Sequence, residues 1–357
     1  MSMKCTIAML LLIVHLDTTG QDTTSKEKEN PFSFSGYGDL YYQYDFNKPA
    51  NNERPSFLYN FKKHNRASVN LAILKVSYQQ KKWKANLAVM AGDYTKYNLA
   101  AEPAFFRHIN EANIGYDFSK IFSINAGILP SHIGIESAIA KDNWNISRSM
   151  LAENTPYYET GVKFNYTPNE KWLFSMLLIN GWQNIKDYNS SKAVGTQIQF
   201  KPNDKLLINS STFFGNERPD SVRQIRLFHN FYLSYAIQPK IKLAFLLDAG
   251  AEQKITKDGY NSWMGAAILL QYLPAKNLNI AGRVEYYMDK ENTIVTSYPA
   301  GKLSVAGFAF NIDYSLSKNL LLRNEARLLN SANNIFENKN ITSRTNFCLL
   351  SCVSLSF

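Results

Sequence analysis

The stretch TNFCLLSCVSLSF at residues 345–357 decides the fold class. Its large apolar side chains alternate with small or polar ones, so Phe347, Leu349, Val353, Leu355 and Phe357 fall on one face of an extended strand. An alternation of period two, with one apolar and one polar face, is typical of a β-strand that separates two different environments. The chain is therefore expected to contain sheets built from strands of this kind.

The same alternation recurs along the chain. In the segment 276–289, for example, Leu278, Ile280 and Val284 oppose Asn279 and Arg283. About sixteen such strands are expected, most of them as long as the ~9–11 residues that a tilted membrane-spanning strand needs. The expected spans are 32–46, 65–79, 83–94, 109–118, 121–130, 157–167, 171–181, 192–201, 204–215, 226–237, 240–253, 261–273, 276–289, 302–316, 319–330 and 341–357.

Short polar turns that carry lysine separate these strands in pairs. They lie at residues 80–82, 119–120, 168–171, 202–205, 238–240, 274–277 and 317–319. Longer stretches rich in Asn, Asp, Ser and Gly alternate with them. Short turns at one end and long loops at the other predict a single antiparallel up-and-down barrel. A barrel of ~16 strands leaves an aqueous channel, whereas ~8 strands would be filled by side chains.

Two observations indicate that the apolar face points to lipid. Aromatic residues cluster beside the short turns, where an interfacial girdle would lie. They are Tyr116, Phe118, Tyr166, Trp172, Phe200, Tyr235, Tyr272 and Tyr314. The opposite face carries full charges, which a water-filled lumen tolerates. A soluble sandwich with the apolar face inward is the alternative. A β-propeller is disfavoured because each repeat holds two strands where a blade needs four.

Residues 1–20 have the pattern of a cleavable signal peptide. Lys4 precedes an apolar run, Thr6–Leu16, that is too short to span a bilayer, and small residues Thr18 and Gly20 follow. We therefore expect a signal peptide at 1–20, a flexible amino-terminal tail at 21–31 and a transmembrane β-barrel at 32–357. The expected location is the outer membrane, reached by export to the periplasm, with outer-membrane lipid as a partner.

Charge and cysteine content exclude several functions. The formal net charge is +10, but every short turn carries lysine at the rim, where charge contributes little to the lumen potential beyond ~8–10 Å. Export and the lack of a basic recognition helix argue against nucleic-acid binding. Cys348 and Cys352 lie four residues apart on one strand, roughly 13 Å, too far for a mutual disulfide. No metal or cofactor motif is present in the sequence.

Several segments resemble one known family. These are SGYGDLYYQYDFNKP at 35–49, GDYTKYNLAAEP at 92–103, NAGILPSHIGIESAIAKDNWNISRSMLAENTPYYETGVK at 125–163, NGWQNI at 180–185 and GTQIQFKPN at 195–203. They resemble the outer-membrane β-barrel porin family porin-2, or OmpL-like, of Bacteroidota. The resemblance is strongest between residues 35 and 203. It implies channel activity in the outer membrane, names no solute and brings no catalytic residue. The final strand, ending in Phe357, also resembles the signal that the barrel assembly machinery recognises.

The third long loop, about 131–155, is the first candidate site. It mixes apolar groups with charged ones, and in water the apolar groups would be exposed. We therefore expect it to fold into the lumen and narrow the pore, with an external cap as the alternative. Its candidate constriction residues are Glu136, Lys141, Asp142, Arg148 and Glu153.

Charges on the inward strand faces are the second candidate site. They are Arg283, Glu285, Arg323, Glu325 and Arg327. They either screen solutes electrostatically or merely pair with one another in the wall. The sequence thus favours a porin for small hydrophilic solutes, with no enzymatic activity and with a homo-oligomer left open.

Two other function classes stay open. An adhesin or structural barrel would have very long outer loops, whereas most loops here have about 10–20 residues. An outer-membrane hydrolase would need a nucleophile such as Ser210 or Thr212 beside His229, together with a third, orienting group. No spacing signature supports that constellation.

Overall fold

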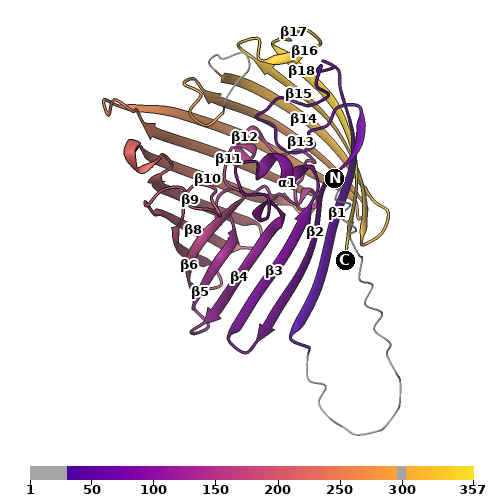
Figure 1. Cartoon of the computed structure of the whole chain (residues 1–357). Coiled ribbons are helices and arrows are strands. Elements are labelled where there is room, and N and C mark those ends of the chain that lie inside the picture. Colours follow the sequence, from indigo (N-terminus) through magenta and orange to yellow (C-terminus); the bar gives the residue numbers. More distant parts are fainter. Residues whose placement is uncertain (1–29, 296–302) are drawn as a thin grey trace, which may run out of the picture. The chain divides into compact units, whose positions relative to one another are not determined.

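Among the residues that the computed structural model describes, 30–295 and 303–357, sixteen antiparallel strands close into one barrel (Figure 1). Each strand pairs with its neighbours along the chain, and β18 pairs with both β15 and β1. The barrel strands are β1 (Phe32–Asp45), β2 (Arg66–Gln80), β3 (Trp83–Ala91), β4 (Ile109–Asp117), β5 (Phe122–Pro130), β6 (Tyr158–Asn169), β7 (Trp172–Ile179), β8 (Ala193–Asn203), β9 (Leu206–Asn216), β10 (Ile225–Gln238), β11 (Ile241–Gln253), β12 (Tyr260–Ala275), β13 (Leu278–Asp289), β14 (Leu303–Ser315), β15 (Leu320–Ser331) and β18 (Thr345–Ser356).

The expected fold class and strand count are confirmed. The predicted strand at 341–357 is partly wrong, because β17 (Ile341–Ser343) pairs with β16 (Phe336–Asn338) in a separate two-stranded sheet. The predicted strand at 83–94 ends earlier, since α1 (Asp93–Asn98) begins after Gly92, whose φ is 121°. The expected signal peptide at 1–20 lies outside the described residues, as does nearly all of the tail at 21–31.

The barrel closes where β1 meets β18. Tyr41 lies opposite Cys352 in this antiparallel pair, and the register runs from Tyr37–Ser356 to Asp45–Cys348. Beyond it, Gly36 and Phe357 exchange two backbone hydrogen bonds of 3.1 Å. Closure leaves no unpaired edge among the sixteen described barrel strands, which is the condition for placing strands in hydrocarbon.

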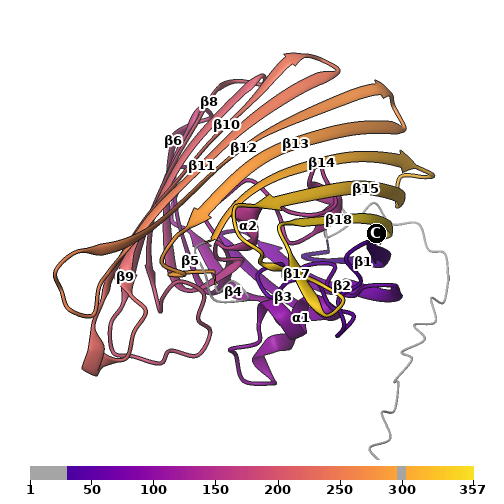
Figure 2. The same ribbon diagram turned by 90° about the horizontal axis from the view of Figure 1, so that it is seen from above.

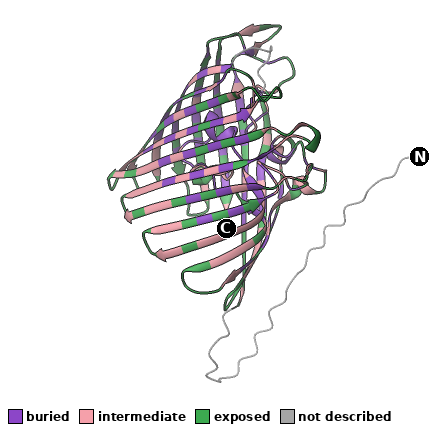
Figure 3. Cartoon of the chain, turned by 90° about the vertical axis from the view of Figure 1, so that its left-hand side faces the viewer, coloured by how far each residue is buried: buried purple, intermediate pink, exposed green. Residues whose placement is uncertain are grey.

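The two faces of the wall are inverted relative to a soluble protein. Leu40 and Tyr42 of β1 are exposed, whereas Asp39, Gln43 and Asp45 of the same strand are buried. The alternating bands of buried and exposed residues continue along the strands in Figure 3. The apolar side chains of β18 predicted to share a face, such as Leu349 and Leu355, are indeed exposed together. An apolar exterior around a polar interior suits a barrel surrounded by lipid.

Exposed and partly exposed aromatic rings gather at the short-turn end. Trp83 contacts Tyr116 with ring centroids 4.8 Å apart, and Trp172 stacks on Phe200 at 4.2 Å. Tyr235, Tyr272 and Tyr314 are also exposed, as the sequence indicated. These rings match the aromatic girdle that flanks the apolar band of membrane barrels.

Long connections occupy the opposite end. They contain α1, the one-turn helix α2 (Met150–Glu153), the 3₁₀ segments η1 (Phe106–His108), η2 (Ala140–Asp142) and η3 (Asp220–Val222), and the β16–β17 sheet. The longest is the segment 131–157 between β5 and β6, called the third loop below. No helix among the described residues is both long and apolar enough to cross a membrane.

Candidate functional site

The third loop is held against the buried face of β13 and β15 by paired charges. The Glu285 carboxylate accepts hydrogen bonds from Arg283 (3.3 Å), from Arg327 (2.8 Å) and from the Met150 amide of α2 (2.6 Å). Arg283 also donates to the Ser147 carbonyl at 2.6 Å. All of these charged groups are almost completely buried. Buried charges are tolerated only when paired and hydrogen-bonded. The third loop therefore supplies hydrogen-bond partners that the buried charges of the wall require.

A second contact joins the loop to β14 and β15. Arg323 donates to the Asp313 carboxylate at 2.8 and 2.9 Å. Its remaining N–H groups donate to backbone carbonyls of the loop at residues 140, 143 and 144. The neighbouring Glu325 accepts from the amide and the hydroxyl of Ser147. Arg323 is fully buried, and its guanidinium fixes the loop backbone at and just after the 3₁₀ segment η2.

A buried histidine fixes the beginning of the loop. His132 Nδ1 lies 2.8 Å from a Glu159 carboxylate oxygen, and its Nε2 lies 2.9 Å from the Thr212 carbonyl oxygen. Both ring nitrogens lie within hydrogen-bond distance of oxygen atoms, so the ring is held from two sides. Gly195 provides the space, because a Cβ there would lie 2.7 Å from the His132 ring. Gly265 makes similar room for Leu151 of α2, with a Cβ contact of 2.8 Å.

Glu136, Arg148 and Glu153 make their contacts largely within the loops. Glu136 accepts from the Ser149 amide at 3.1 Å and lies 3.6 Å from Arg283. The Arg148 guanidinium carbon lies 3.7 Å from the centroid of the Tyr157 ring. Glu153 accepts from the Tyr157 hydroxyl at 3.3 Å. Burial raises the pKa of Tyr157 well above its ordinary value, so this hydroxyl stays protonated and can donate.

The ten candidate pore residues predicted from the sequence thus fall into a buried group and an exposed group. Eight are buried in the contacts between loop and wall or between loops: Glu136, Arg148, Glu153, Arg283, Glu285, Arg323, Glu325 and Arg327. Lys141 and Asp142 are exposed. Only Lys141, Glu136 and Arg148 of the ten border the cavity described next.

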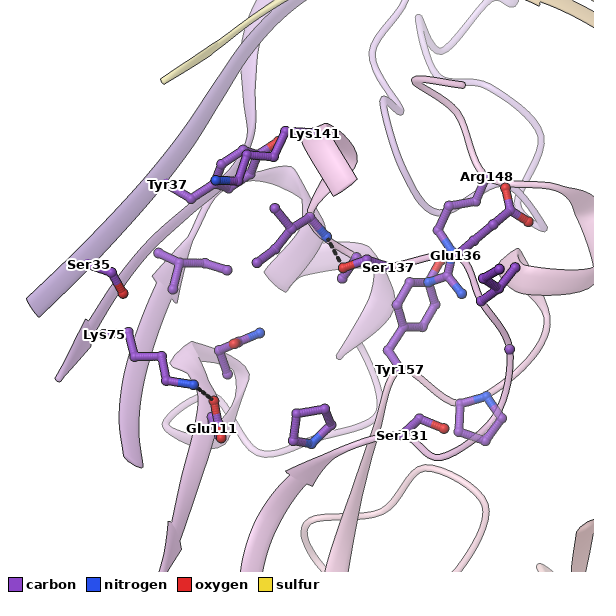
Figure 4. Close-up of a pocket in the computed structure, with 18 of the residues that line it drawn as sticks. Ser35, Tyr37, Lys75, Glu111, Ser131, Glu136, Ser137, Lys141, Arg148 and Tyr157 are labelled. Atoms are coloured by element: carbon purple, nitrogen blue, oxygen red, sulfur yellow. Dashed lines mark hydrogen bonds and ion pairs between the residues drawn. The ribbon is translucent and has the colours of Figure 1, made fainter. Parts of the chain in front are cut away.

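A cavity of about 470 Å³, called the wall cavity, separates the third loop from β1, β2 and β4. Figure 4 shows Lys75 and Glu111 on one side of it and Arg148 and Tyr157 on the other. Lys75 and Glu111 form an ion pair of 2.5 Å. A second pair on the same wall, Lys84–Asp117, measures 2.6 Å. All four side chains lie on the polar face of alternating strands, but the sequence analysis did not single them out. Period-two alternation in 66–80, 83–91 and 109–117 is the signal that could have found them.

A second cavity of about 360 Å³, called the loop cavity, lies among the long connections. It is bordered by parts of the first, second, third and fourth long loops and by Thr293 and Ile294 after β13. Tyr157 borders both cavities. The described residues contain no group of three or more His, Cys, Asp or Glu side chains placed to hold a metal ion.

Among the polar contacts on the exposed face of the described strands, one involves a histidine. The Ser210 hydroxyl lies 2.9 Å from Nε2 of His229, and Thr212 is opposite His229 in the β9–β10 register. The described part of the chain shows no carboxylate hydrogen-bonded to the other nitrogen of this ring. A serine–histidine pair without an orienting third group is incomplete as a nucleophile.

Comparison with known proteins adds a family and a set of similar folds. The family model described as "Putative beta-barrel porin-2, OmpL-like" matches residues 31–357. No protein with a curated description matches the sequence.

Solved structures resemble the barrel at low sequence identity. The anion-selective porin from Comamonas acidovorans has a TM-score of 0.61 at 10% identity and covers 91% of this chain and 99% of its own. The outer-membrane channel DcaP of Acinetobacter baumannii has a TM-score of 0.58 at 10% identity, and the match covers 91% of this chain and 97% of DcaP. A trimer form of OmpT from Vibrio cholerae has a TM-score of 0.55 at 8% identity, and the match covers 91% of this chain and 100% of the OmpT chain. At this identity the likeness establishes the fold.

Proposed function

The chain belongs to the β-barrel porin-2, OmpL-like family of the outer membrane, and on that premise we propose that small hydrophilic solutes diffuse through its barrel past the third loop. One observation carries this proposal: the exposed wall is apolar, while the polar faces of β2, β3 and β4 carry the ion pairs Lys75–Glu111 and Lys84–Asp117, and the first of these pairs borders the wall cavity. Ion pairs on a barrel interior are typical of a water-filled lumen.

Folding of the third loop into the lumen is part of the proposal. Its hydrogen bonds reach β6, β9, β13 and β15, strands that lie in different sectors of the closed order. In Figure 2, seen from above, α2 is drawn within the ring of strands. A loop that touches several sectors through their buried faces has to cross the interior. It packs over the β6–β15 side and also contacts apolar residues of β1, β2 and β3, and the wall cavity is the space that we propose for solutes between the loop and β1, β2 and β4.

The two cavities define the proposed route. A solute would enter the loop cavity, pass Tyr157 and continue through the wall cavity beside Lys75, Glu111 and Lys141. Tyr157 is the proposed narrowest point because its ring borders both spaces. The buried charges Arg283, Glu285, Arg323, Glu325 and Arg327 hold the loop in place in this account.

Liposome swelling tests the function directly. Vesicles that contain the refolded protein should swell in isotonic solutions of small sugars or amino acids, at rates that fall as solute size rises. Vesicles with an adhesin or a closed barrel would not swell. Absence of swelling with a correctly folded barrel would overturn the proposal in favour of that alternative.

The partners follow from the same reasoning. The exposed apolar face would contact outer-membrane lipid, and residues 1–20 would direct export to the periplasm. The strand β18, which ends beside Phe357, would be read by the barrel assembly machinery. A homo-oligomer is supported by the trimer form of the similar OmpT barrel. Chemical crosslinking in native membranes would detect it as a ladder of multiples of the monomer mass.

A second candidate function rests on the Ser210–His229 contact. Both side chains are accessible from the exposed face, where a lipid ester could reach them. A phospholipase assay on wild type and His229→Ala decides between the functions. Ester cleavage that His229→Ala abolishes would establish a hydrolase, and equal background rates for both proteins would exclude it.

A further inference from the structure

Arg148 of the third loop is a buried cation without a counter-charge in contact with it. The side chain is 3% exposed, yet within the described residues its guanidinium donates no hydrogen bond and lies within 4.0 Å of no carboxylate oxygen. Its contact is with the face of the Tyr157 ring, 3.7 Å from the ring centroid. A buried charge is costly unless it is paired, so this cation indicates a partner that the chain itself does not supply.

The other buried arginines of the described chain all have hydrogen-bond partners. Each donates to at least one protein oxygen: Arg54 to Asn346, Arg226 to Glu252, Arg283 to Ser147, Arg323 to Asp313 and Arg327 to Glu285. The fold therefore satisfies its buried guanidinium groups elsewhere. Arg148 differs from them because it also borders an open space, the wall cavity.

One nitrogen of Arg148 is available to that cavity. Nε and Nη1 are enclosed by protein without a partner, whereas Nη2 keeps accessible surface and donates no hydrogen bond. Figure 4 shows the side chain beside Tyr157, across the cavity from Lys75 and Glu111. A guanidinium charge is spread over all three nitrogens. An oxygen atom in the cavity could therefore accept from Nη2 and meet the charge of the whole group.

The unpaired charge around the wall cavity is positive. Both carboxylates of the lining have cationic neighbours: Glu111 pairs with Lys75 at 2.5 Å, and Glu136 lies 3.6 Å from Arg283. Lys141 is exposed on the lining and forms no ion pair with a carboxylate of the described chain. Arg148 and Lys141 thus remain without a carboxylate partner. A cavity with an excess of one charge attracts ligands of the opposite charge, here anions.

Apolar side chains supply much of the remaining lining. Ile135, Ala138 and Ile139 of the third loop border the cavity and are half-buried, and Ile73 of β2 borders it as well. Such surface favours a ligand whose own hydrocarbon part is removed from water against it, which a bare inorganic ion cannot offer. The cavity volume of about 470 Å³ falls within the ~300–1,000 Å³ of typical ligand pockets. The lining therefore suits a small organic anion.

We propose that the wall cavity binds a small organic carboxylate. The ligand carboxylate would accept a hydrogen bond from Nη2 of Arg148 and be attracted by Lys141, and its hydrocarbon part would lie against Ile135 and Ile139. This inference rests on the proposed function and deepens it, because it names a class of solute for the passage beside the third loop. It gives Arg148 a binding role in addition to its contact with Tyr157.

Isothermal titration calorimetry with sodium benzoate tests the site, and benzyl alcohol is the uncharged ligand of similar shape. The folded barrel is kept in a non-ionic detergent at constant ionic strength, and heats measured with detergent alone are subtracted. Wild type should give saturable heat with benzoate and none with benzyl alcohol. Arg148→Met should raise the dissociation constant about tenfold or more, the order expected for the loss of a hydrogen bond to a charged group.

Three further variants make the test decisive. Arg148→Lys keeps the charge and should recover part of the affinity. Arg223→Met is the matched control, because it removes an exposed arginine of η3 that does not border the cavity, and it should bind benzoate as wild type does. Lys141→Gln changes an exposed side chain of the lining and should weaken binding severalfold, also where Arg148→Met fails to fold.

Three results would overturn the inference. They are the absence of saturable heat with benzoate, equal binding of benzyl alcohol, and wild-type affinity in Arg148→Met or, where that variant does not fold, in Lys141→Gln. Liposome swelling without benzoate binding would leave the porin function intact. Benzoate binding by a barrel that neither swells liposomes nor conducts current would refute the pore and keep the site.

Discussion

The Arg148 guanidinium lies 3.7 Å from the centroid of the Tyr157 ring, and Tyr157 borders the wall cavity and the loop cavity. A cation over an aromatic face is attracted by about 0.5–2 kcal/mol, depending on its desolvation. Arg148 is almost completely buried, so the contact fixes the position of Tyr157. The width of the proposed route therefore depends on one side chain that the third loop itself holds.

Removing that ring should widen the pore. Tyr157→Ala is expected to raise single-channel conductance in a planar bilayer, because the side chain between the two cavities is lost. Tyr188→Ala is the matched control, since Tyr188 also lies on a long loop but borders neither cavity. Equal conductance in wild type and Tyr157→Ala would show that the constriction lies elsewhere.

Anchoring of the third loop depends on Gly195. An alanine Cβ there would lie 2.7 Å from the His132 ring and would displace it from Glu159. Overpacking of this kind costs about 1–3 kcal/mol, so Gly195→Ala should lower the unfolding temperature in detergent. Gly38→Ala meets nothing within 4 Å and should leave that temperature almost unchanged. Equal unfolding temperatures of the two variants, measured by circular dichroism, would contradict the role of Gly195 in holding the third loop.

Ion selectivity should respond to the pair beside the wall cavity. Glu111→Gln removes the carboxylate that lies 2.5 Å from Lys75 and leaves an unpaired cation in the lumen. The reversal potential under a KCl gradient should shift toward anion preference. Asp204→Asn is the control, because Asp204 is fully exposed in a short turn and rim charges are screened over ~8–10 Å. A larger shift in the control would place the solute route away from Glu111.

Stability should rise with pH through one lysine of the first long loop. Burial, with Arg54 nearby, lowers the pKa of Lys62 from its ordinary 10.5 to about 7. Between these two values the unfolded chain binds a proton that the folded protein does not, so unfolding becomes less favourable as pH rises. The unfolding temperature should therefore increase from pH 7 to pH 9. Lys62→Met should weaken this dependence, and an unchanged slope would contradict the assignment.

Much of the fold could be predicted because alternation of period two is a local property. The strand expected at 240–253 is observed at Ile241–Gln253, and the polar and apolar faces fall as the pattern required. The pattern failed where local cues conflicted. Ile341 continues an apolar alternation, yet residues 341–343 pair with Phe336–Asn338 instead of joining the barrel.

The site was less accessible to such reasoning, because its contacts join residues far apart in the chain. Alternation placed Glu285 on an inward face but gave no sign that it would accept the Met150 amide of a distant loop. Nor does any pattern reveal that Gly195 leaves room for His132. Partners far apart in the sequence depend on barrel closure and on the path of a loop in which only the short segments η2 and α2 are helical.

The central claim is that a water-filled passage runs beside the third loop. Chemical modification of a cysteine introduced in place of Lys141 tests it most directly, since this exposed residue borders the wall cavity while its exposed neighbour Asp142 does not. The native Cys348 and Cys352 are buried and should stay unreactive. Single-channel recording should show an open pore for Lys141→Cys whose current falls in steps when a bulky, water-soluble thiol reagent is added. Asp142→Cys should respond much less. A barrel that conducts no current, or a current that modification of Lys141→Cys leaves unchanged, would contradict a water-filled passage beside the third loop.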